Sequence, residues 1–149
     1  MTSTPFNLLL ADDDTDDCIF FKEALEELPV IAALTTVNDG VQLMQLLTTK
    51  TDTLPHALYL DLNMPRKNGF DCLTEIKQIE KLKQLPVIIF STSFDTEVVN
   101  LLHERGANYY IQKPAEFSIL KKIISKSLDL ISETKEKQPP REKFVIKAI

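Results

Sequence analysis

Acidic side chains that follow two apolar runs are the residues best placed to do chemistry in this chain. Asp12 and Asp13 come directly after the run Phe6–Ala11, and Asp61 comes directly after Ala57–Leu60. Carboxylates held close together repel one another unless a cation lies between them, and oxygen ligands without Cys or His favour Mg²⁺ over zinc. Magnesium keeps several waters and accepts a phosphate oxygen, so the pattern is typical of a site that handles a phosphoryl group.

Two further side chains complete this pattern. Ser91 follows the apolar run 86–90, and Lys113 follows the run 109–111 after one intervening residue. The ammonium would supply positive charge, and the hydroxyl a hydrogen bond, to the equatorial oxygens of a transferring phosphoryl group. One of the carboxylates would then be the nucleophile, as in enzymes that form an aspartyl phosphate.

Three more acidic residues, Asp14, Asp16 and Asp17, lie just behind the first acidic pair. Acidic residues are favoured in the first turn of a helix, which is the positive end of the helix dipole. We therefore expect these three residues to start a helix and solubilise the strand end, with no part in the chemistry.

The elements that must position these residues alternate along the chain. Short continuous apolar runs, typical of strands in a parallel sheet covered on both faces, separate longer segments with helical spacing. The expected strands are residues 6–11, 30–37, 57–60, 86–90 and 109–111. The expected helices lie near residues 18–28, 40–47, 70–79, 98–102 and 120–131, with Pro29 ending the first and Gly106 capping the fourth. Five βα units with right-handed crossovers predict a three-layer α/β/α sandwich, in which ligands bind beyond the carboxyl ends of the strands.

Composition excludes several classes of function for this 149-residue chain. Its three glycines, Gly40, Gly69 and Gly106, are too far apart for either common glycine-rich phosphate loop. A net charge of −5 argues against nucleic-acid binding, which needs a basic face. The first positive charge is Lys22 and no apolar run approaches the ~18 residues of a membrane helix, so we expect a cytoplasmic chain with no membrane segment.

The cysteines and histidines are isolated from one another. Cys18 and Cys72 have no CxxC partner, and His56 and His103 are equally far apart. We expect neither a zinc site nor a structural disulfide, and interpret both cysteines as small buried apolar residues.

The motifs, taken in order, resemble the receiver domain of two-component response regulators. They are LLLADDD at 8–14, LDLNMP at 60–65 followed by NG at 68–69, IFST at 89–92 and KP at 113–114. Each motif alone is weak, whereas together they are highly specific and cover about residues 6–131. The resemblance implies a CheY-like, flavodoxin-like (βα)5 fold whose five-stranded parallel sheet has the order 2-1-3-4-5.

The resemblance also implies roles for individual residues. Asp61 matches the aspartate that takes a phosphoryl group from a phosphohistidine. Asp12 and Asp13 match the acidic pair that holds Mg²⁺ together with Asp61 and the backbone carbonyl of Asn63. Lys113 matches the lysine that contacts the phosphate.

Four other positions follow from the same resemblance. Ser91 matches the hydroxyl switch position and Tyr110 the aromatic switch position on the fifth strand. The peptide bond before Pro114 is expected to be cis, which costs little before proline. Thr92 departs from the Ala or Gly common in the family, so we expect narrower access to Asp61 and a changed phosphoryl lifetime.

These observations predict a stand-alone receiver made of residues 6–131, with residues 132–149 as a C-terminal tail and no output domain. The chain would be a phosphoacceptor that assists its own phosphorylation and dephosphorylation, with no outside substrate. A sensor histidine kinase or histidine phosphotransfer protein would supply the phosphoryl group, and a downstream protein would receive the signal. The long loop after the third strand and the tail resemble single-domain regulators, including those partnered with phytochrome kinases.

The tail regains apolar character at Phe144, Val145, Ile146 and Ile149. We expect these residues to pack on the body of the domain or across a homodimer. Such a homodimer would form through the tail or through the face made by the fourth helix, fifth strand and fifth helix. A frayed terminus is the competing interpretation.

One other function remains as an alternative, the phosphatase or phosphotransferase, and a flavin-binding module is discounted. An aspartyl-phosphate phosphatase or phosphotransferase of the haloacid-dehalogenase type needs a second acid two residues after its nucleophile, where this chain has Asn63. A flavin-binding module of the same fold needs a Ser/Thr-Gly phosphate loop after the first strand, where this chain is acidic. Activity on a chromogenic phosphate ester would distinguish the phosphatase from the receiver.

Overall fold

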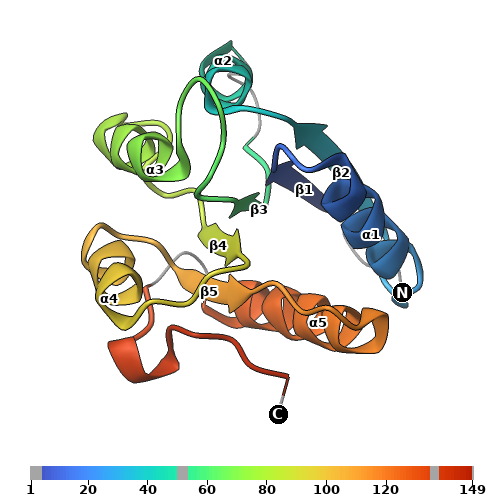
Figure 1. The fold of residues 1–149 in the computed structure, drawn as a ribbon. Helices are drawn as coiled ribbons and strands as arrows, with labels where there is room; N and C mark the ends of the chain where they lie inside the picture. The colour runs from blue at the N-terminus through green and yellow to red at the C-terminus, as the bar shows by residue number, and fades with distance from the viewer. Residues whose placement is uncertain (1–4, 50–53, 135–137, 149) are drawn as a thin grey trace.

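Five parallel strands form one sheet, in the order β2-β1-β3-β4-β5. This computed structural model describes residues 5–49, 54–134 and 138–148 (Figure 1). The strands are β1 (Phe6–Ala11), β2 (Ala32–Val37), β3 (Ala57–Leu60), β4 (Val87–Ser91) and β5 (Tyr109–Gln112). The helices are α1 (Thr15–Glu26), α2 (Gly40–Thr49), α3 (Gly69–Gln78), α4 (Thr96–Glu104) and α5 (Phe117–Thr134), followed by a short 3-10 turn, η1 (Arg141–Lys143). The predicted fold class and strand order are confirmed.

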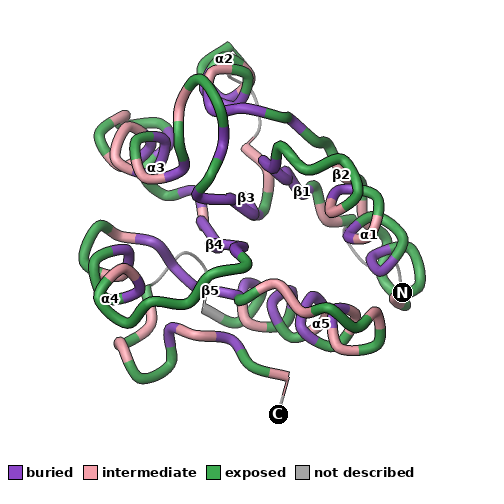
Figure 2. Tube along the Cα trace, viewed as in Figure 1, coloured by how far each residue is buried: buried purple, intermediate pink, exposed green. Residues whose placement is uncertain are grey.

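Helices cover both faces of the sheet, α1 and α5 on one side and α2, α3 and α4 on the other (Figure 1). Alternate residues of β1 serve the two cores: Leu8 and Leu10 pack toward α1 and α5, whereas Leu9 and Ala11 pack toward α2 and α3. The central strands are buried along their length (Figure 2). Burial on both faces explains why these strands read as continuous apolar runs.

The ends of several elements differ from the expected ones. β2 begins at Ala32, because Val30 and Ile31 are exposed in the turn that leaves α1. α1 ends at Glu26, three residues before Pro29, so the proline follows the helix without terminating it directly. Gly106 has a φ of 100°, which confirms it as the left-handed residue after α4. Both cysteines are buried and free, as expected.

The C-terminal segment, residues 138–148, adds an edge to the sheet beside β5. The amide of Tyr110 donates to the carbonyl of Phe144 at 3.0 Å, and the amide of Ile146 donates to the carbonyl of Tyr110 at 2.9 Å. The two stretches form a parallel bridge at Tyr110 and Val145. Phe144 is fully buried and Ile146 is 4% exposed, so the tail packs on the body as predicted. Ile149 lies outside the described residues.

Side chains hold the same segment against the end of α4. The Nε2 atom of His103 lies 2.8 Å from the carbonyl oxygen of Pro139. The amide of Gln138 donates to the carbonyl of His103, and Nε of Arg141 donates to Asn100. The segment is therefore bonded to α4 and β5 together, which closes one edge of the sheet.

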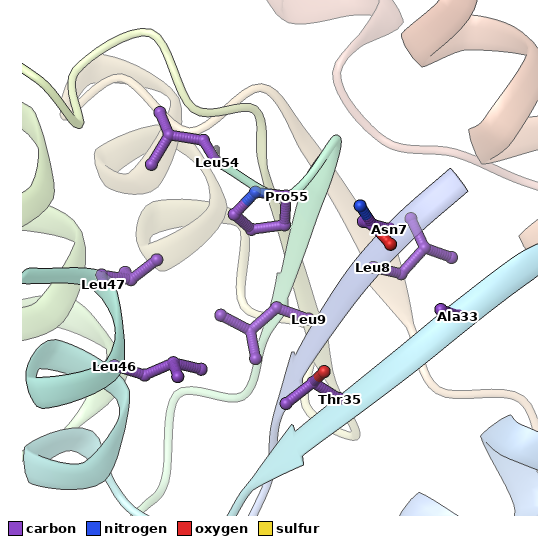
Figure 3. A pocket seen from close by; sticks show the side chains of 9 residues that line it. All are labelled: Asn7, Leu8, Leu9, Ala33, Thr35, Leu46, Leu47, Leu54 and Pro55. Carbon is purple, nitrogen blue, oxygen red and sulfur yellow. The ribbon is translucent and has the colours of Figure 1, made fainter. Parts of the chain in front are cut away.

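A cavity of about 160 Å³ lies between α2 and strands β1 and β2 (Figure 3). It is lined by Leu9 and Thr35 from the strands, by Leu46 and Leu47 from α2, and by Pro55 among others. Its β1 residues are Asn7, Leu8 and Leu9, whereas the acidic residues follow the carboxyl end of that strand. Within the described ranges, no helix is both long and apolar enough to cross a bilayer.

Truncating the central tail side chain provides a test of this docking. Phe144→Ala should lower the free energy of unfolding by about 3 kcal/mol, because a fully buried aromatic ring is lost. It should also speed hydrogen exchange at the amides of Tyr110 and Ile146, the two donors of the bridge. Lys143→Ala, at an exposed neighbour, is the control and should change neither. Unchanged protection of both amides in Phe144→Ala would contradict this account of how the segment is held.

Candidate functional site

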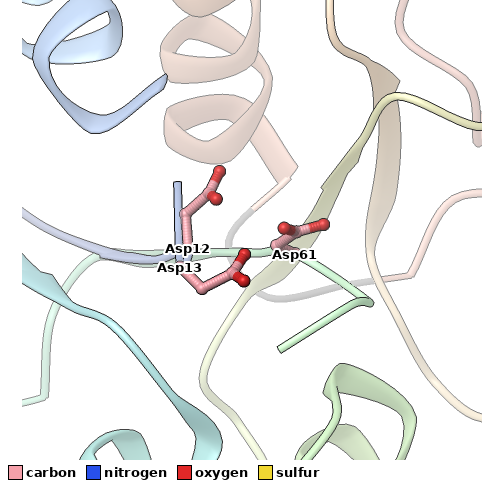
Figure 4. Close-up of side chains that lie close together, drawn as sticks. All are labelled: Asp12, Asp13 and Asp61. Carbon is pink, nitrogen blue, oxygen red and sulfur yellow. The ribbon is translucent and has the colours of Figure 1, made fainter. Parts of the chain in front are cut away.

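Three carboxylates converge at the carboxyl ends of β1 and β3 (Figure 4). Asp12 and Asp13 follow β1 and Asp61 follows β3, because neighbouring parallel strands end at the same edge of the sheet. One carboxylate oxygen from each residue lies within 4.8 Å of the others. Asp12 and Asp61 are buried, whereas Asp13 is exposed to solvent.

Lys113 reaches into this acidic group from the end of β5. Its Nζ lies 2.8 Å from Oδ2 of Asp12, 2.8 Å from Oδ2 of Asp17 and 3.6 Å from Oδ2 of Asp61. Burial acts to lower the pKa of Lys113, but its close contacts with the carboxylates of Asp12 and Asp17 and the negative charge of Asp61 outweigh the effect of burial. The net pKa is raised, so the side chain is a fixed positive charge.

One buried oxygen of the site, Oδ2 of Asp12, has an ion pair with Lys113 but no hydrogen bond of good geometry. Oδ1 of Asp12 accepts the amide of Asp14 at 3.0 Å, but the fully buried Oδ2 accepts no hydrogen bond of acceptable geometry, although Lys113 is close. The ammonium is shared with Asp17 and Asp61, so the charge of this buried carboxylate is only partly neutralised. A divalent cation with oxygen preference would neutralise it, and the all-carboxylate donor set fits such an ion. The residues present therefore fit a divalent cation site.

The pKa of Asp61 is raised to about 6. Burial is the largest cause, Lys113 opposes it, and the negative charge of Asp12 adds to it. The backbone amide of Asn63 donates a hydrogen bond to the Asp61 carboxylate, which acts to lower the pKa. Asp61 is thus a carboxylate whose charge is only partly compensated, and added positive charge would ionise it fully.

Ser91 and Tyr110 lie on adjacent strands beside this group. Ser91 ends β4 and is fully buried; its Oγ lies 3.1 Å from Oγ of Ser93. Tyr110 is also fully buried, and its hydroxyl donates to the carbonyl of Ser93. The aromatic ring contacts Phe94 at 5.7 Å and Phe144 at 6.4 Å between centroids. The two predicted switch residues are therefore linked through Ser93, and the tail lies directly behind the tyrosine.

Close backbone packing holds the loop that carries Asp61. The amide of Gly69 donates to the carbonyl of Leu62 at 2.9 Å. A β-carbon at Gly69 would lie 2.3 Å from the carbonyl oxygen of Asp61, so only glycine fits there without a backbone shift. Asn68 caps α3 by accepting the amide of Asp71. The NG pair thus starts the helix and fixes the end of the loop.

Two expectations about this region are wrong. No cis peptide bond occurs in the described residues, so the bond before Pro114 is trans, the form that X–Pro bonds favour by about 0.5–1 kcal/mol. Asp17 is not a helix-start charge alone, because it forms an ion pair with Lys113. A helical signal could have indicated this: Asp17 lies four residues before the buried Phe21, on the inward side of α1. Asp14 behaves as expected and caps the helix.

Comparison with known proteins agrees with the fold. The family model of the response regulator receiver domain matches residues 8–125, so the chain belongs to this family. It is similar to the response regulator Rcp1 of Synechocystis, with 30% identity over 83% of this chain and 86% of that protein. The crystal structure of the phosphorylated cyanobacterial phytochrome response regulator RcpA is 30% identical, with a TM-score of 0.79 over 88% of this chain and 96% of that one. The Mn²⁺-bound form of Rcp1 is 29% identical, with a TM-score of 0.76 over 91% of this chain and all of that one.

The raised pKa of Asp61 predicts a pH-dependent cost to stability. In the folded protein its pKa is about 6 against 3.8 for the ordinary group, so the proton is held more tightly after folding. The favourable contribution of Asp61 to the free energy of unfolding is therefore fully present below about pH 4 and is lost as the pH rises through about 6. Without divalent cations, Asp61→Asn should therefore be more stable than the parent by about 1–3 kcal/mol at pH 7.5 and by less at pH 5.

Urea unfolding in EDTA at several pH values would measure this difference. Asp16→Asn, at an exposed acidic residue outside the site, is the control and should show no pH-dependent gain. A wild-type chain that is equally or more stable than Asp61→Asn at pH 7.5 would show that Lys113 compensates the buried charges fully.

Proposed function

We propose that this chain is a phosphorylation switch in which Asp61 accepts a phosphoryl group. The observation that carries the proposal is the convergence of Asp12, Asp13 and Asp61 beside Lys113, where one ammonium is shared among several carboxylates. Membership of the receiver family and similarity to a regulator solved in its phosphorylated form support the same function.

The chemical step is an in-line transfer onto the Asp61 carboxylate. One Asp61 oxygen attacks phosphorus, the bond from phosphorus to the donor nitrogen of a phosphohistidine breaks, and the imidazole leaves with a proton from solvent. Lys113, whose Nζ is already 3.6 Å from Asp61, would pair with a phosphoryl oxygen. Ser91 would offer its hydroxyl to another oxygen.

Asp12, Asp13, Asp61 and the backbone carbonyl of Asn63 would hold Mg²⁺ in this reaction. When bound, the ion supplies positive charge that neutralises the attacking carboxylate and the phosphoryl oxygens. The relative solved with Mn²⁺ supports a divalent cation at this site. The exposure of Asp13 leaves a path by which the ion and its waters can enter.

The partners that we propose follow from the same function. A sensor histidine kinase or histidine phosphotransfer protein would donate the phosphoryl group, and a downstream protein would read the result in the cytoplasm. Residues 6–131 would act as the receiver and residues 138–148 as part of its surface. A homodimer through the α4–β5–α5 face would have to accommodate this segment, which is bonded to α4 and β5.

Intact mass measurement tests the phosphoryl transfer directly. Incubation with Mg²⁺ and acetyl phosphate or phosphoramidate should add about 80 Da, because one phosphoryl group replaces one proton. Asp61→Asn and addition of EDTA should each abolish the gain in mass, and Asp16→Asn should retain it.

Turnover of a chromogenic phosphate ester would instead favour the phosphatase, a function that Asn63 disfavours because an asparagine cannot act as a general acid. An unmodified wild-type mass in both assays would refute the switch.

The linked hydrogen bonds predict where the phosphorylated state differs. When the Ser91 hydroxyl turns toward a phosphoryl oxygen, it leaves Ser93, whose carbonyl accepts from Tyr110. Beryllofluoride with Mg²⁺, a mimic of the aspartyl phosphate, should therefore shift the amide signals of Ser93, Tyr110 and Ile146, since the last is bonded to the tyrosine backbone. Shifts confined to the loops around Asp61 would contradict this coupling, and Asp61→Asn should show none.

A further inference from the structure

Asp17 pairs with the ammonium of Lys113 from helix α1, whereas the other carboxylates of the site follow strands. Oδ2 of Asp17 accepts a hydrogen bond from Nζ at 2.8 Å, across 96 positions of sequence. The lysine side chain is 8% exposed, and that of Asp17 is 34% exposed. Asp17 therefore joins the first turn of α1 to the end of β5 at the edge of the site.

The helix itself does not need this carboxylate. Asp14 is the N-cap of α1, and it accepts the backbone amide of Asp17, which any residue would supply. Asp16 lies in the same first turn, is exposed, and gives the helix dipole the same kind of charge. The ion pair with Lys113 is thus a separate contribution of the Asp17 side chain.

An ammonium has three N–H donors, and their directions are coupled by its tetrahedral geometry. In the structure two carboxylates, those of Asp12 and Asp17, lie at 2.8 Å from Nζ, and that of Asp61 lies at 3.6 Å. Asp17 is not among the carboxylates that converge on the candidate cation site, whereas Asp12 is. A cation that draws on Asp12 would leave Asp17 as the carboxylate that fixes the ammonium.

We propose that Asp17 is a positioning residue, which orients Lys113 so that one of its N–H donors points at Asp61 and at the phosphoryl group placed there. The inference rests on the proposed function of Asp61 and adds a residue to it. Holding the charge in place before the phosphoryl group arrives removes the cost of ordering a long flexible side chain at that moment.

The negative charge of Asp17 also acts against binding of the phosphoryl group, and the experiment must distinguish this repulsion from positioning of Lys113. A carboxylate near the site also repels an incoming phosphoryl group, although solvent screens this partly exposed side chain. Asp17→Asn keeps an oxygen that accepts from Lys113 and removes the charge, whereas Asp17→Ala removes both. Positioning predicts that the two variants differ, and repulsion predicts that both bind the mimic more tightly.

Affinity for beryllofluoride at saturating Mg²⁺, measured by fluorine NMR on the full chain, is the first readout. Asp17→Ala should weaken binding about five- to tenfold, and Asp17→Asn should stay within about threefold of the parent. Asp16→Ala is the matched control for loss of charge in the first turn and should leave the affinity unchanged. Equal affinity in Asp17→Ala and the parent, or tighter binding by both Asp17 variants, would overturn the proposal.

A double-mutant cycle shows whether Asp17 acts through the lysine. In the Lys113→Ala background, Asp17→Ala should have no further effect on affinity for beryllofluoride; a full effect there would overturn the proposal.

If Lys113→Ala does not fold, the NMR signal of the Lys113 ammonium in the otherwise unchanged chain tests the same point. Exchange of its Nζ protons with solvent should be faster in Asp17→Ala and should stay slow in Asp16→Ala. An Nζ signal unchanged by Asp17→Ala would count against the inference. A parent chain that binds no beryllofluoride would instead refute the proposed function, and this inference with it.

Discussion

Repulsion among the carboxylates at the ends of β1 and β3 is the constraint on which the rest of the site depends. Asp12 and Asp61 are both buried, so their charges cannot be screened by water as those of surface acids are. The fold brings the ammonium of Lys113 to them from the end of β5, which lies two places from β3 and three places from β1 in the sheet. The pKa of Asp61 is raised even beside this ammonium, and Oδ2 of Asp12 has the ion pair but no hydrogen bond of good geometry. The site is thus short of positive charge, which favours binding of a divalent cation.

The same shortage of positive charge makes the orientation of the Lys113 ammonium important. An ammonium among several carboxylates has more than one attractive orientation, and its usefulness depends on which oxygen it faces. Asp17 limits that choice from α1, and the backbone amide of Lys113 donates to the carbonyl of Ser91 at 2.8 Å. The lysine is therefore tied at both its backbone and its side chain. In this arrangement the helix, the two strands and the acidic pair form one electrostatic unit.

The tail extends this unit to the far edge of the sheet. Tyr110 is bonded to Ser93 through its hydroxyl and to Phe144 and Ile146 through its backbone. A displacement at Ser91 can thus reach the outer surface through two hydrogen-bonded neighbours, without a long chain of intermediates. Closely packed interiors have few alternative arrangements, so such a displacement produces a discrete change. The surface that a partner would meet beside β5 is made partly of residues 138–148.

The residues directly after each strand could be assigned to the site from sequence alone. Continuous apolar runs indicated a parallel sheet, and parallel strands end at one edge, so chain order was enough to bring Asp12, Asp61 and Lys113 together. The starts of α3 at Gly69 and of α1 after Asp14 could be predicted in the same way, because capping depends only on residues near the helix end. Contacts between elements far apart in the chain could not be obtained in this way. The Tyr59–Ser127 hydrogen bond between β3 and α5 and the docking of Phe144 behind Tyr110 carry no periodic signal. Helical spacing places Asp17 on the inward side of α1, but it does not identify Lys113 as the partner of its carboxylate. These contacts depend on how the helices lie across the sheet, which only tertiary packing decides.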